Sequence, residues 1–246
     1  MDRMIYLAMS AAKQMLNAQA LATHNLANAN TVGFKADFEA MRAMPLYGPG
    51  LPTRAFAMTE RPGTNLAPGA IETTNNDLDV AINGDGYLAV LAPDGSEAYT
   101  RAGDLQLTVN GQLQTATGRP VLGNGGPIAV PPSEALVIGV DGTISVRPLG
   151  QEANTLATID RIKLVNPDPA ELSKGPDGLL RLRDGANAPA DASVQLARGA
   201  LERSNVNTVA EMVRIIENAR QYEMAVKAMR TAQEIDTSSA RIMRLS

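Results

Sequence analysis

The sequence contains no cysteine, and its 246 residues include only one histidine, His24. The absence of cysteine excludes disulfides, thiolate zinc sites and a cysteine nucleophile. One histidine cannot form a two-histidine metal site, and a Ser-His-Asp triad would have to use His24 within a stretch of small, helix-forming residues. We therefore interpret His24 as a polar residue near a helix end. We expect no catalytic residue, no metal site and no cofactor.

Aromatic residues make up only 3% of the chain, and tryptophan is absent. A deep aromatic pocket for a small-molecule substrate is therefore not expected. No apolar run reaches the length of about 18 residues that a membrane-spanning helix needs, so we expect no membrane insertion. The net charge is −4 without a basic stripe, which argues against nucleic-acid binding. The first residues, Met1 to Tyr6, lack the features of a cleaved signal peptide.

The N-terminal segment from Arg3 to Asn28 contains neither glycine nor proline, which predicts a helix. Positions alternately three and four residues apart are mostly apolar, a pattern typical of a helix seam that packs against other helices. Alanine is frequent in this seam and allows neighbouring helices to approach closely. The predicted seam consists of Ile5, Ala8, Ala12, Met15, Gln19, Ala22, Leu26 and Ala29.

The C-terminal segment from Val206 to Leu245 also lacks glycine and proline and predicts a second, longer helix. Asn207 or Thr208 is placed to cap its start, and Glu211 in the first turn suits the helix dipole. The predicted seam of this helix consists of Met212, Ile215, Ala219, Tyr222, Val226, Met229, Gln233, Asp236, Ala240 and Met243.

The middle of the chain differs from both ends, since all 15 prolines lie between Pro45 and Gly199. Short alternating segments are separated by turn signals such as Asn110-Gly111, which is typical of hairpins. This pattern predicts an all-β domain, either a sandwich or a partly closed barrel. The predicted strands are 79–82, 87–91, 98–100, 105–109, 112–114, 136–140, 143–146, 159–165 and 179–182.

The predicted fold class is therefore α+β, with long N- and C-terminal α-helices that form a coiled-coil-like helical domain and a central, mainly-β domain. The predicted domains are 1–40 together with 205–246 for the helical assembly domain, 41–78 for an extended arm, and 79–204 for the β body. The helices pair with each other, with copies from neighbouring subunits, or with both. The alternative is an ordinary α+β domain whose terminal helices cover one sheet.

Few motifs indicate chemistry. Gly84-Asp85-Gly86 is followed by no predicted helix, so it indicates a β-turn rather than a phosphate-binding loop. Asp77, Asp79 and Asp85 lack the spacing of a calcium loop. A carboxylate pair for glycoside hydrolysis is not singled out by any pattern, although a β-domain hydrolase stays an alternative.

The most distinctive segment lies where the first helix should end. It reads Asn25-Leu26-Ala27-Asn28-Ala29-Asn30-Thr31-Val32-Gly33-Phe34-Lys35. Asparagine favours helix caps and turns, and Gly33 permits a positive φ at a helix stop. Ser204-Asn205-Val206-Asn207 has a similar pattern just before the second helix.

These two segments resemble the signatures of the flagellar rod and hook protein family. The N-terminal signature is matched by Asn25, Leu26, Ala27, Asn28, Thr31, Gly33, Phe34 and Lys35. The C-terminal signature is matched by Ser204, Asn205, Val206 and Asn207. Three features are similar to proximal rod members of the family. They are the first residues of the chain, the segment Arg42-Ala43-Met44-Pro45 with Leu51-Pro52-Thr53-Arg54, and Gly86-Tyr87-Leu88. The distal rod members are the alternative.

The resemblance implies a structural protein without enzymatic activity. It implies a subunit of the proximal rod that assembles with its own copies and with neighbouring rod proteins through terminal helices, and that transmits torque to hook and filament. Members of this family pass through the flagellar type III export apparatus without a cleaved signal and lie in the periplasmic space. Their terminal helices become ordered on assembly, and such heterologous contacts build a helical tube.

Overall fold

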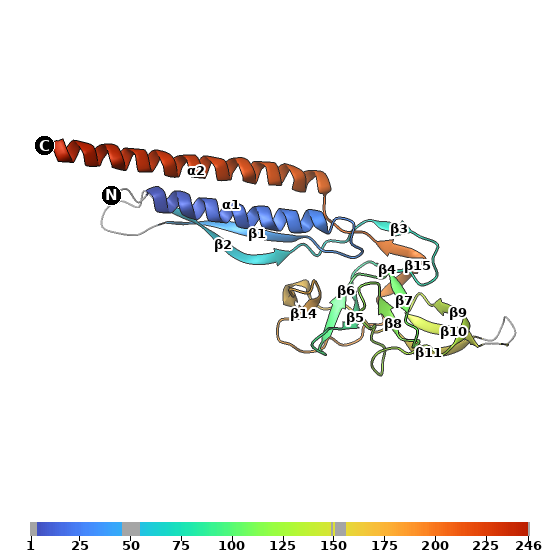
Figure 1. Ribbon diagram of the computed structural model, residues 1–246. Helices are drawn as coiled ribbons and strands as arrows, with labels where there is room; N and C mark the ends of the chain where they lie inside the picture. The colour runs from blue at the N-terminus through green and yellow to red at the C-terminus, as the bar shows by residue number, and fades with distance from the viewer. Residues whose placement is uncertain (1–3, 46–54, 149, 151–155, 246) are drawn as a thin grey trace. The chain divides into compact units, whose positions relative to one another are not determined.

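A computed structural model of the chain describes residues 4–45, 55–148, 150 and 156–245 (Figure 1). The chain divides into two compact units. The first, which we call the helical unit, is drawn from residues 1–29, 36–65 and 206–246. The second, the β body, is drawn from residues 30–35 and 66–205.

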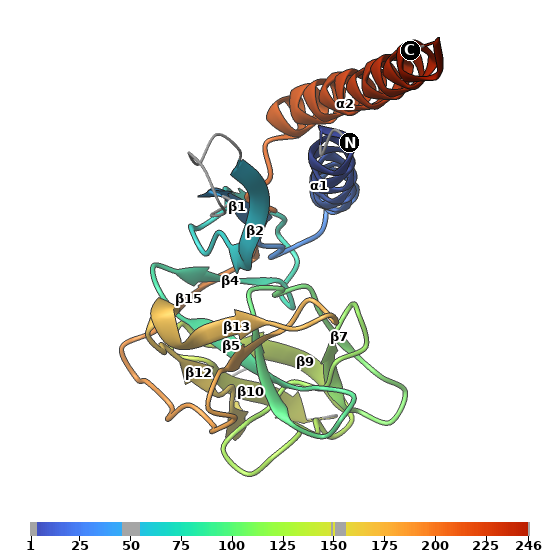
Figure 2. The same ribbon diagram turned by 90° about the vertical axis from the view of Figure 1, so that its left-hand side faces the viewer.

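The helical unit consists of α1 (Met4–Ala27), α2 (Thr208–Leu245) and a hairpin of β1 (Asp37–Pro45) and β2 (Ala55–Thr64). The two helices run side by side, and α1 also contacts both strands of the hairpin (Figures 1 and 2). The two predicted helices are confirmed, with bounds within two residues of those expected. Long stretches without glycine or proline allow both helices to continue unbroken.

The prediction that the terminal helices alone form a coiled-coil-like domain is wrong. The described chain has only these two α-helices, and α1 packs on a β hairpin as well as on α2. Packing against two partners requires a wider apolar face than a coiled-coil seam. Leu7, Ala11 and Leu21, which lie beside the predicted seam, are accordingly half-buried. Part of the expected arm, residues 41–78, forms this hairpin, and residues 46–54 lie outside the described residues.

The β body contains small antiparallel sheets. A five-stranded sheet has the order β12-β5-β6-β14-β13, and a three-stranded sheet has the order β11-β10-β9. Strand pairs β15-β4, β16-β3 and β7-β8 complete it. The bounds are β3 (Ile71–Thr73), β4 (Val80–Asn83), β5 (Tyr87–Leu91), β6 (Glu97–Thr100), β7 (Leu105–Leu107), β8 (Leu113–Thr115), β9 (Ser133–Ile138), β10 (Thr143–Pro148), β11 (Ala157–Arg161), β12 (Leu164–Val165), a 3-10 turn (Pro169–Glu171), β13 (Leu172–Lys174), β14 (Leu180–Leu182), β15 (Gln195–Arg198) and β16 (Ala200–Glu202).

Each predicted strand of the β body corresponds to a strand in the structure, with 159–165 divided into β11 and β12. The sequence analysis missed β3, β13, β15 and β16. These strands have three or four residues each, too few for alternation to be recognised. Apart from β13, which pairs with the neighbouring β14, these strands also have partners far along the chain, as where Leu196 of β15 pairs with Ile82 of β4.

Strand β5 lies at the centre of the body and is buried on both faces. Leu88 and Val90 belong to one apolar cluster, while Tyr87 and Ala89 belong to a second cluster. Because successive side chains of a strand point to opposite faces, the five-stranded sheet separates two cores. The β body therefore encloses two apolar cores of its own, although Val109, Val140 and Leu156 are exposed.

Candidate assembly site: terminal helices and signature segments

The inward face of α1 is formed mainly by small residues. Ala8, Ala12 and Ala22 are buried, and Ile5, Met15 and Leu26 of the predicted seam are half-buried. Small side chains let α1 approach both α2 and the hairpin closely. The seam residues of α1 thus contribute to packing inside the helical unit.

The inward face of α2 is rotated slightly from the predicted seam. Ile215, Ala219, Tyr222, Val226 and Met229 are half-buried, whereas Met212 is 52% exposed. A row of buried or half-buried positions runs from Glu211 through Asn218 and Ala225 to Ala232, seven residues apart along one face. Ala232 is fully buried beside the predicted Gln233, which is exposed. The side chain of Met243 lies outside the described residues.

The outward faces of both helices expose large apolar side chains. On α1 these are Tyr6, Met9 and Leu16, with exposed fractions of 63%, 54% and 50%. On α2 the exposed fractions lie between 48% and 69%, and the residues are Val209, Met212, Val213, Ile216, Met224 and Ile235. Exposed apolar residues that follow one helix face mark a surface for contact with other molecules.

The start of the N-terminal signature fixes the turn after α1. The buried Asn25 side chain donates from Nδ2 to the carbonyl of Asp37 at 2.8 Å and accepts from the Asp37 N–H at 3.0 Å. This pair of bonds attaches β1 to the last turn of α1. Asn28 donates from its side chain to the carbonyl of His24 at 2.9 Å, Ala27 and Thr31 are exposed, and Asn28 is half-buried.

Gly33 occupies a position in the β body that only glycine fits. Its φ is +66°, and an added Cβ would lie 2.3 Å from the carbonyl carbon of Arg101 and from the amide nitrogen of Ala102. Its N–H donates to the carbonyl of Glu202 at 2.8 Å. The Phe34 ring follows, with Lys174 Nζ 4.0 Å from its centroid, which is the geometry of a cation–π contact.

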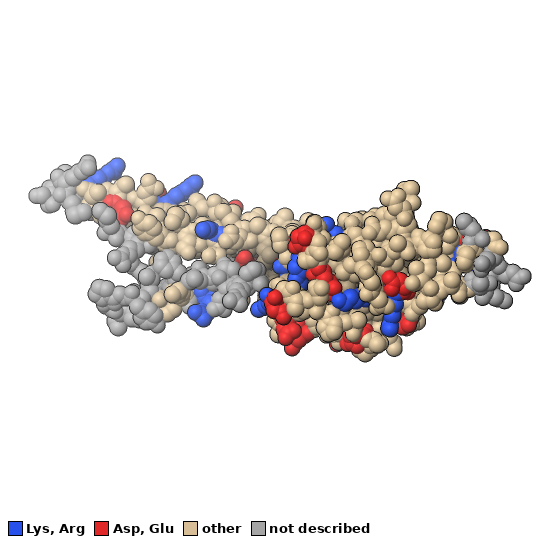
Figure 3. Space-filling view, turned by 90° about the horizontal axis from the view of Figure 1, so that it is seen from below, with Lys and Arg blue, Asp and Glu red and all other residues tan. Residues whose placement is uncertain are grey.

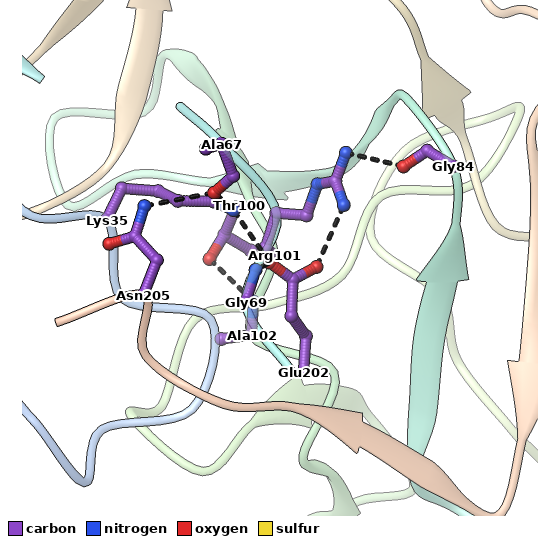
Figure 4. A network of polar contacts seen from close by, with 9 residues as sticks. All are labelled: Lys35, Ala67, Gly69, Gly84, Thr100, Arg101, Ala102, Glu202 and Asn205. Atoms are coloured by element: carbon purple, nitrogen blue, oxygen red, sulfur yellow. Dashed lines mark hydrogen bonds and ion pairs between the residues drawn. The ribbon is translucent and has the colours of Figure 1, made fainter. Parts of the chain in front are cut away.

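Lys35 ends the signature in a buried ionic cluster with Glu202 and Arg101 (Figure 4). Lys35 Nζ lies 2.6 Å from Glu202 Oε1, and Arg101 Nη1 lies 2.8 Å from Glu202 Oε2. The Gly69 N–H also donates to Oε1, at 2.9 Å. Lys35 donates further to the carbonyl of Ala67, and Arg101 donates to the carbonyl of Gly84, both at 2.8 Å. All three charged side chains are at most 4% exposed.

The charge balance of this cluster appears in the pKa values. Burial lowers the pKa of Lys35, against the opposing effect of Glu202. Burial would raise the pKa of Glu202, but bonds from Gly69, Lys35 and Arg101 outweigh it and hold this pKa below its ordinary value. Glu202 is therefore an ionised carboxylate that neutralises the buried cations. The cluster joins β16 to the end of the N-terminal signature and to the segment after β6.

The C-terminal signature continues directly from this cluster. Asn205 donates from Nδ2 to the carbonyl of Ala67 at 2.9 Å, and its N–H donates to the carbonyl of Phe34 at 3.3 Å. Asn207 Oδ1 accepts from the Ala210 N–H at 3.1 Å and so caps α2, as predicted. Ser204 and Val206 are half-buried. Within the β body, residues of the two signatures are thus in direct contact, although about 170 positions separate Phe34 from Asn205.

Sequence reasoning did not find Glu202 or the role of Arg101. Arg101 follows β6 directly, and nothing in the sequence around it indicates that its charge is buried. Glu202 is 167 positions from Lys35, so no spacing rule could join them. The only available signal was that a glutamate lies two residues before the C-terminal signature.

Comparison with known proteins identifies the class to which these features belong. Residues 5–35 match the family described as flagella basal body rod protein, residues 81–146 match the flagellar hook protein FlgE/F/G D1 domain, and residues 197–242 match the flagellar basal body rod FlgEFG protein C-terminal family. These matches define a protein of the flagellar rod and hook class. No helix in the described part of the chain is long and apolar enough to cross a membrane.

Full-length relatives narrow this class. The chain is 45% identical to the flagellar basal-body rod protein FlgF of Escherichia coli strain K12, over 95% of both chains. It is 43% identical to FlgF of Salmonella typhimurium strain LT2 over 100% of both chains. FlgG of Borreliella burgdorferi is 34% identical over 90% of this chain and 91% of its own. The chain therefore belongs to the FlgF family of flagellar basal-body rod proteins and is a structural subunit of the rod.

Proposed function

We propose that this rod subunit lies in the proximal rod, assembles with its own copies and with neighbouring rod subunits through α1 and α2, and transmits torque towards hook and filament. The observation that carries this proposal is the apolar outward face of both helices. A rigid, torque-bearing tube needs extensive contacts between subunits, and exposed apolar faces along two helices provide them.

In this proposal, the predicted terminal assembly domain, residues 1–40 and 205–246, contains residues with two different roles. Inward residues such as Ala8, Ala12 and Ala22 hold α1 within the helical unit. Outward residues such as Met9, Leu16 and Ile216 contact neighbouring subunits. The signature residues hold the chain where α1 ends and where α2 begins.

The proposal also includes the route to the rod. We infer export through the flagellar type III apparatus without a cleaved signal peptide, assembly in the periplasmic space, and no enzymatic activity. The absence of cysteine supports this, since the chain needs no disulfide to become stable after export. The β body instead depends on its two apolar cores and on the buried Glu202 cluster.

The test places the same charge at two exposed positions of α2. Ile216→Glu puts a carboxylate on the outward apolar face, whereas Gln221→Glu puts it on an exposed polar position. Both purified variants should melt within about 2 °C of the unsubstituted protein, because surface changes have small effects on stability. In cells whose own copy is deleted, we expect Ile216→Glu to abolish incorporation into basal bodies and swimming.

Gln221→Glu should support normal swimming in the same cells. Equal incorporation of both variants would contradict the proposed role of the outward faces. Loss of swimming with Ile216→Glu despite normal incorporation would contradict the assembly mechanism and point to a later step.

A further inference from the structure

A pocket of about 280 Å³ opens within the helical unit, between the last turns of α1, the start of β1 and the first turns of α2. Its wall is partly apolar, with Leu21 and Phe38, and partly acidic, with Asp37, Glu39 and Glu211. Asn218 and Arg214 of α2 complete the polar side. The volume is several times that of one water, so the pocket can take a whole side chain.

Glu211 has one carboxylate oxygen in this pocket without a hydrogen-bond donor in the described structure. The residue is 6% exposed, and its Oε1 accepts from Arg214 Nη1 at 2.9 Å. Its Oε2 is buried and has no hydrogen-bond partner in the described structure. A buried carboxylate oxygen without a donor is unfavourable, and a donor supplied from outside would relieve this.

Glu39 repeats the feature on the other side of the pocket. The β1–β2 pairing shifts between Phe38 and Ala40, so Glu39 sits at an irregularity of the strand, where side chains are often redirected. Its Oε2 is also buried without a hydrogen-bond partner in the described structure. Asp37, in contrast, has its Oδ1 bonded to Thr64 and its Oδ2 3.6 Å from His24.

The pocket thus has three carboxylates and one arginine, Arg214, whose side chain is 61% exposed. A positively charged group would balance the carboxylates of the pocket, and the apolar wall suits a methylene chain that carries such a group. Lysine and arginine combine an apolar stem with a cationic head. A bare metal ion fits less well, since no group of three or more metal-binding side chains occurs in the described part of the chain.

We propose that this pocket receives a lysine or arginine side chain from the C-terminal half of α2 in a second copy of this chain. That half of α2 exposes Lys227, Arg230 and Arg241, whose side chains form no ion pair in the described structure. Figure 3 shows isolated basic side chains along the helical unit. The proposal rests on the assembly function above and names one of its contacts.

The geometry makes the contact head-to-tail. The pocket lies at the N-terminal end of α2, and Lys227, Arg230 and Arg241 lie in the other half of this helix. A contact between two different patches of identical subunits is heterologous and extends from copy to copy, which is how helical tubes are built. The acidic pocket of one copy would therefore be filled by the basic half of α2 from the next.

The absence of cysteine allows a direct test in assembled basal bodies. Asn218→Cys is combined in one chain with Lys227→Cys, Arg230→Cys or Arg241→Cys. Positions nine or more residues apart on one helix lie about 13 Å or more apart and cannot form a disulfide within the chain. We expect disulfide-linked dimers from at least one pair. The pair Gln221→Cys with Arg230→Cys, outside the pocket, should give only background.

Adding Glu211→Gln, which keeps the size and removes the charge, should weaken the contact by roughly 30-fold or more and abolish the dimer. The melting temperature of the purified variant is the control that checks whether the helical unit is intact. Absence of all three cross-links, or a cross-link that Glu211→Gln leaves unchanged, would overturn the pocket proposal. If Ile216→Glu still blocks incorporation in that case, the proposed function stands and only the pocket contact fails.

Discussion

The two units of this chain solve the burial of apolar residues in different ways. In the β body, strand β5 is buried on both faces and two clusters hold side chains such as Leu88 and Tyr87. In the helical unit, α1 and α2 bury alanines inward and leave Ile216 and Met224 more than half exposed. The body encloses its two cores within one chain and exposes apolar residues on separate segments, such as Val109 and Val140, whereas the helical unit exposes apolar residues along one face of each helix.

This difference explains how one subunit can be both stable and able to assemble. A body with closed cores can fold before any neighbour is present. A pair of helices with apolar outer faces gains further stability only when neighbours cover them. Substitutions should therefore affect stability in the body and assembly on the outer helix faces.

The largest effect is expected from removing the buried anion of the body. Glu202→Gln leaves Lys35 and Arg101 buried without their carboxylate, and we expect a loss of about 3–5 kcal/mol in the free energy of unfolding. Urea unfolding of the purified protein measures it. The control is Glu72→Gln, which breaks an exposed pair with Arg203 and should cost about 1 kcal/mol or less. Equal losses would mean that the buried cluster is not special.

Within the helical unit, the inner and outer faces of α2 can be compared one turn apart. Ala232→Glu buries a charge at a position that is 0% exposed, and we expect it to cost about 3 kcal/mol. Ile235→Glu, at a position that is 52% exposed, should change stability by about 0.5 kcal/mol or less. Circular dichroism during thermal unfolding reports both. A similar cost at the two positions would remove the distinction between the faces.

Gly33→Ala tests the junction between the signature and the body. The added Cβ would overlap the backbone of Arg101 at a positive φ, which we expect to cost about 2 kcal/mol. Gly185→Ala is the matched control, because its φ is +73° but nothing lies within 4 Å of the new Cβ. It should cost about 1 kcal/mol, the penalty of the positive φ alone. Urea unfolding measures the loss of stability in both variants. Identical losses would show that the close contact of Gly33 with the backbone of Arg101 does not matter.

The smallest effect is a pH dependence of the body. The pKa of Glu202 is lower in the folded protein than its ordinary value of 4.5, so the unfolded chain takes up the proton first as pH falls. The contribution of Glu202 to stability is present above that value and is lost as pH falls through the folded pKa. The stability difference between the unsubstituted protein and Glu202→Gln should therefore narrow in urea unfolding from neutral pH to about pH 4. A constant difference would contradict the assignment of an ionised Glu202.

The sequence predicted the elements better than their packing. Stretches without glycine or proline located α1 and α2, and Asn-Gly or Asp-Gly turns located most strands of the body. The coiled-coil expectation failed because periodicity reports which face is apolar and not what covers it. In α1 that face meets a β hairpin as well as α2.

The candidate site was predictable where it is local. The cap at Asn207 and the positive φ of Gly33 follow from neighbouring residues, but the close contact of Gly33 with the backbone of Arg101 does not. The Glu202 cluster and the pocket at Glu211 depend on residues brought together from distant parts of the chain, and Glu39 became part of the pocket through an irregularity in β1. No spacing rule in a single sequence carries such information.

The proposed assembly requires that the outward faces of α1 and α2 become covered in the rod. Single cysteines in place of Ile216 and Met224 of α2, and in place of the exposed Ala20 of α1, can be labelled with a maleimide in the purified protein and in intact basal bodies. We expect rapid labelling of all three cysteines in the free protein and strong protection of all three in the rod. Equal labelling of Ile216→Cys and Met224→Cys in both states would contradict this expectation.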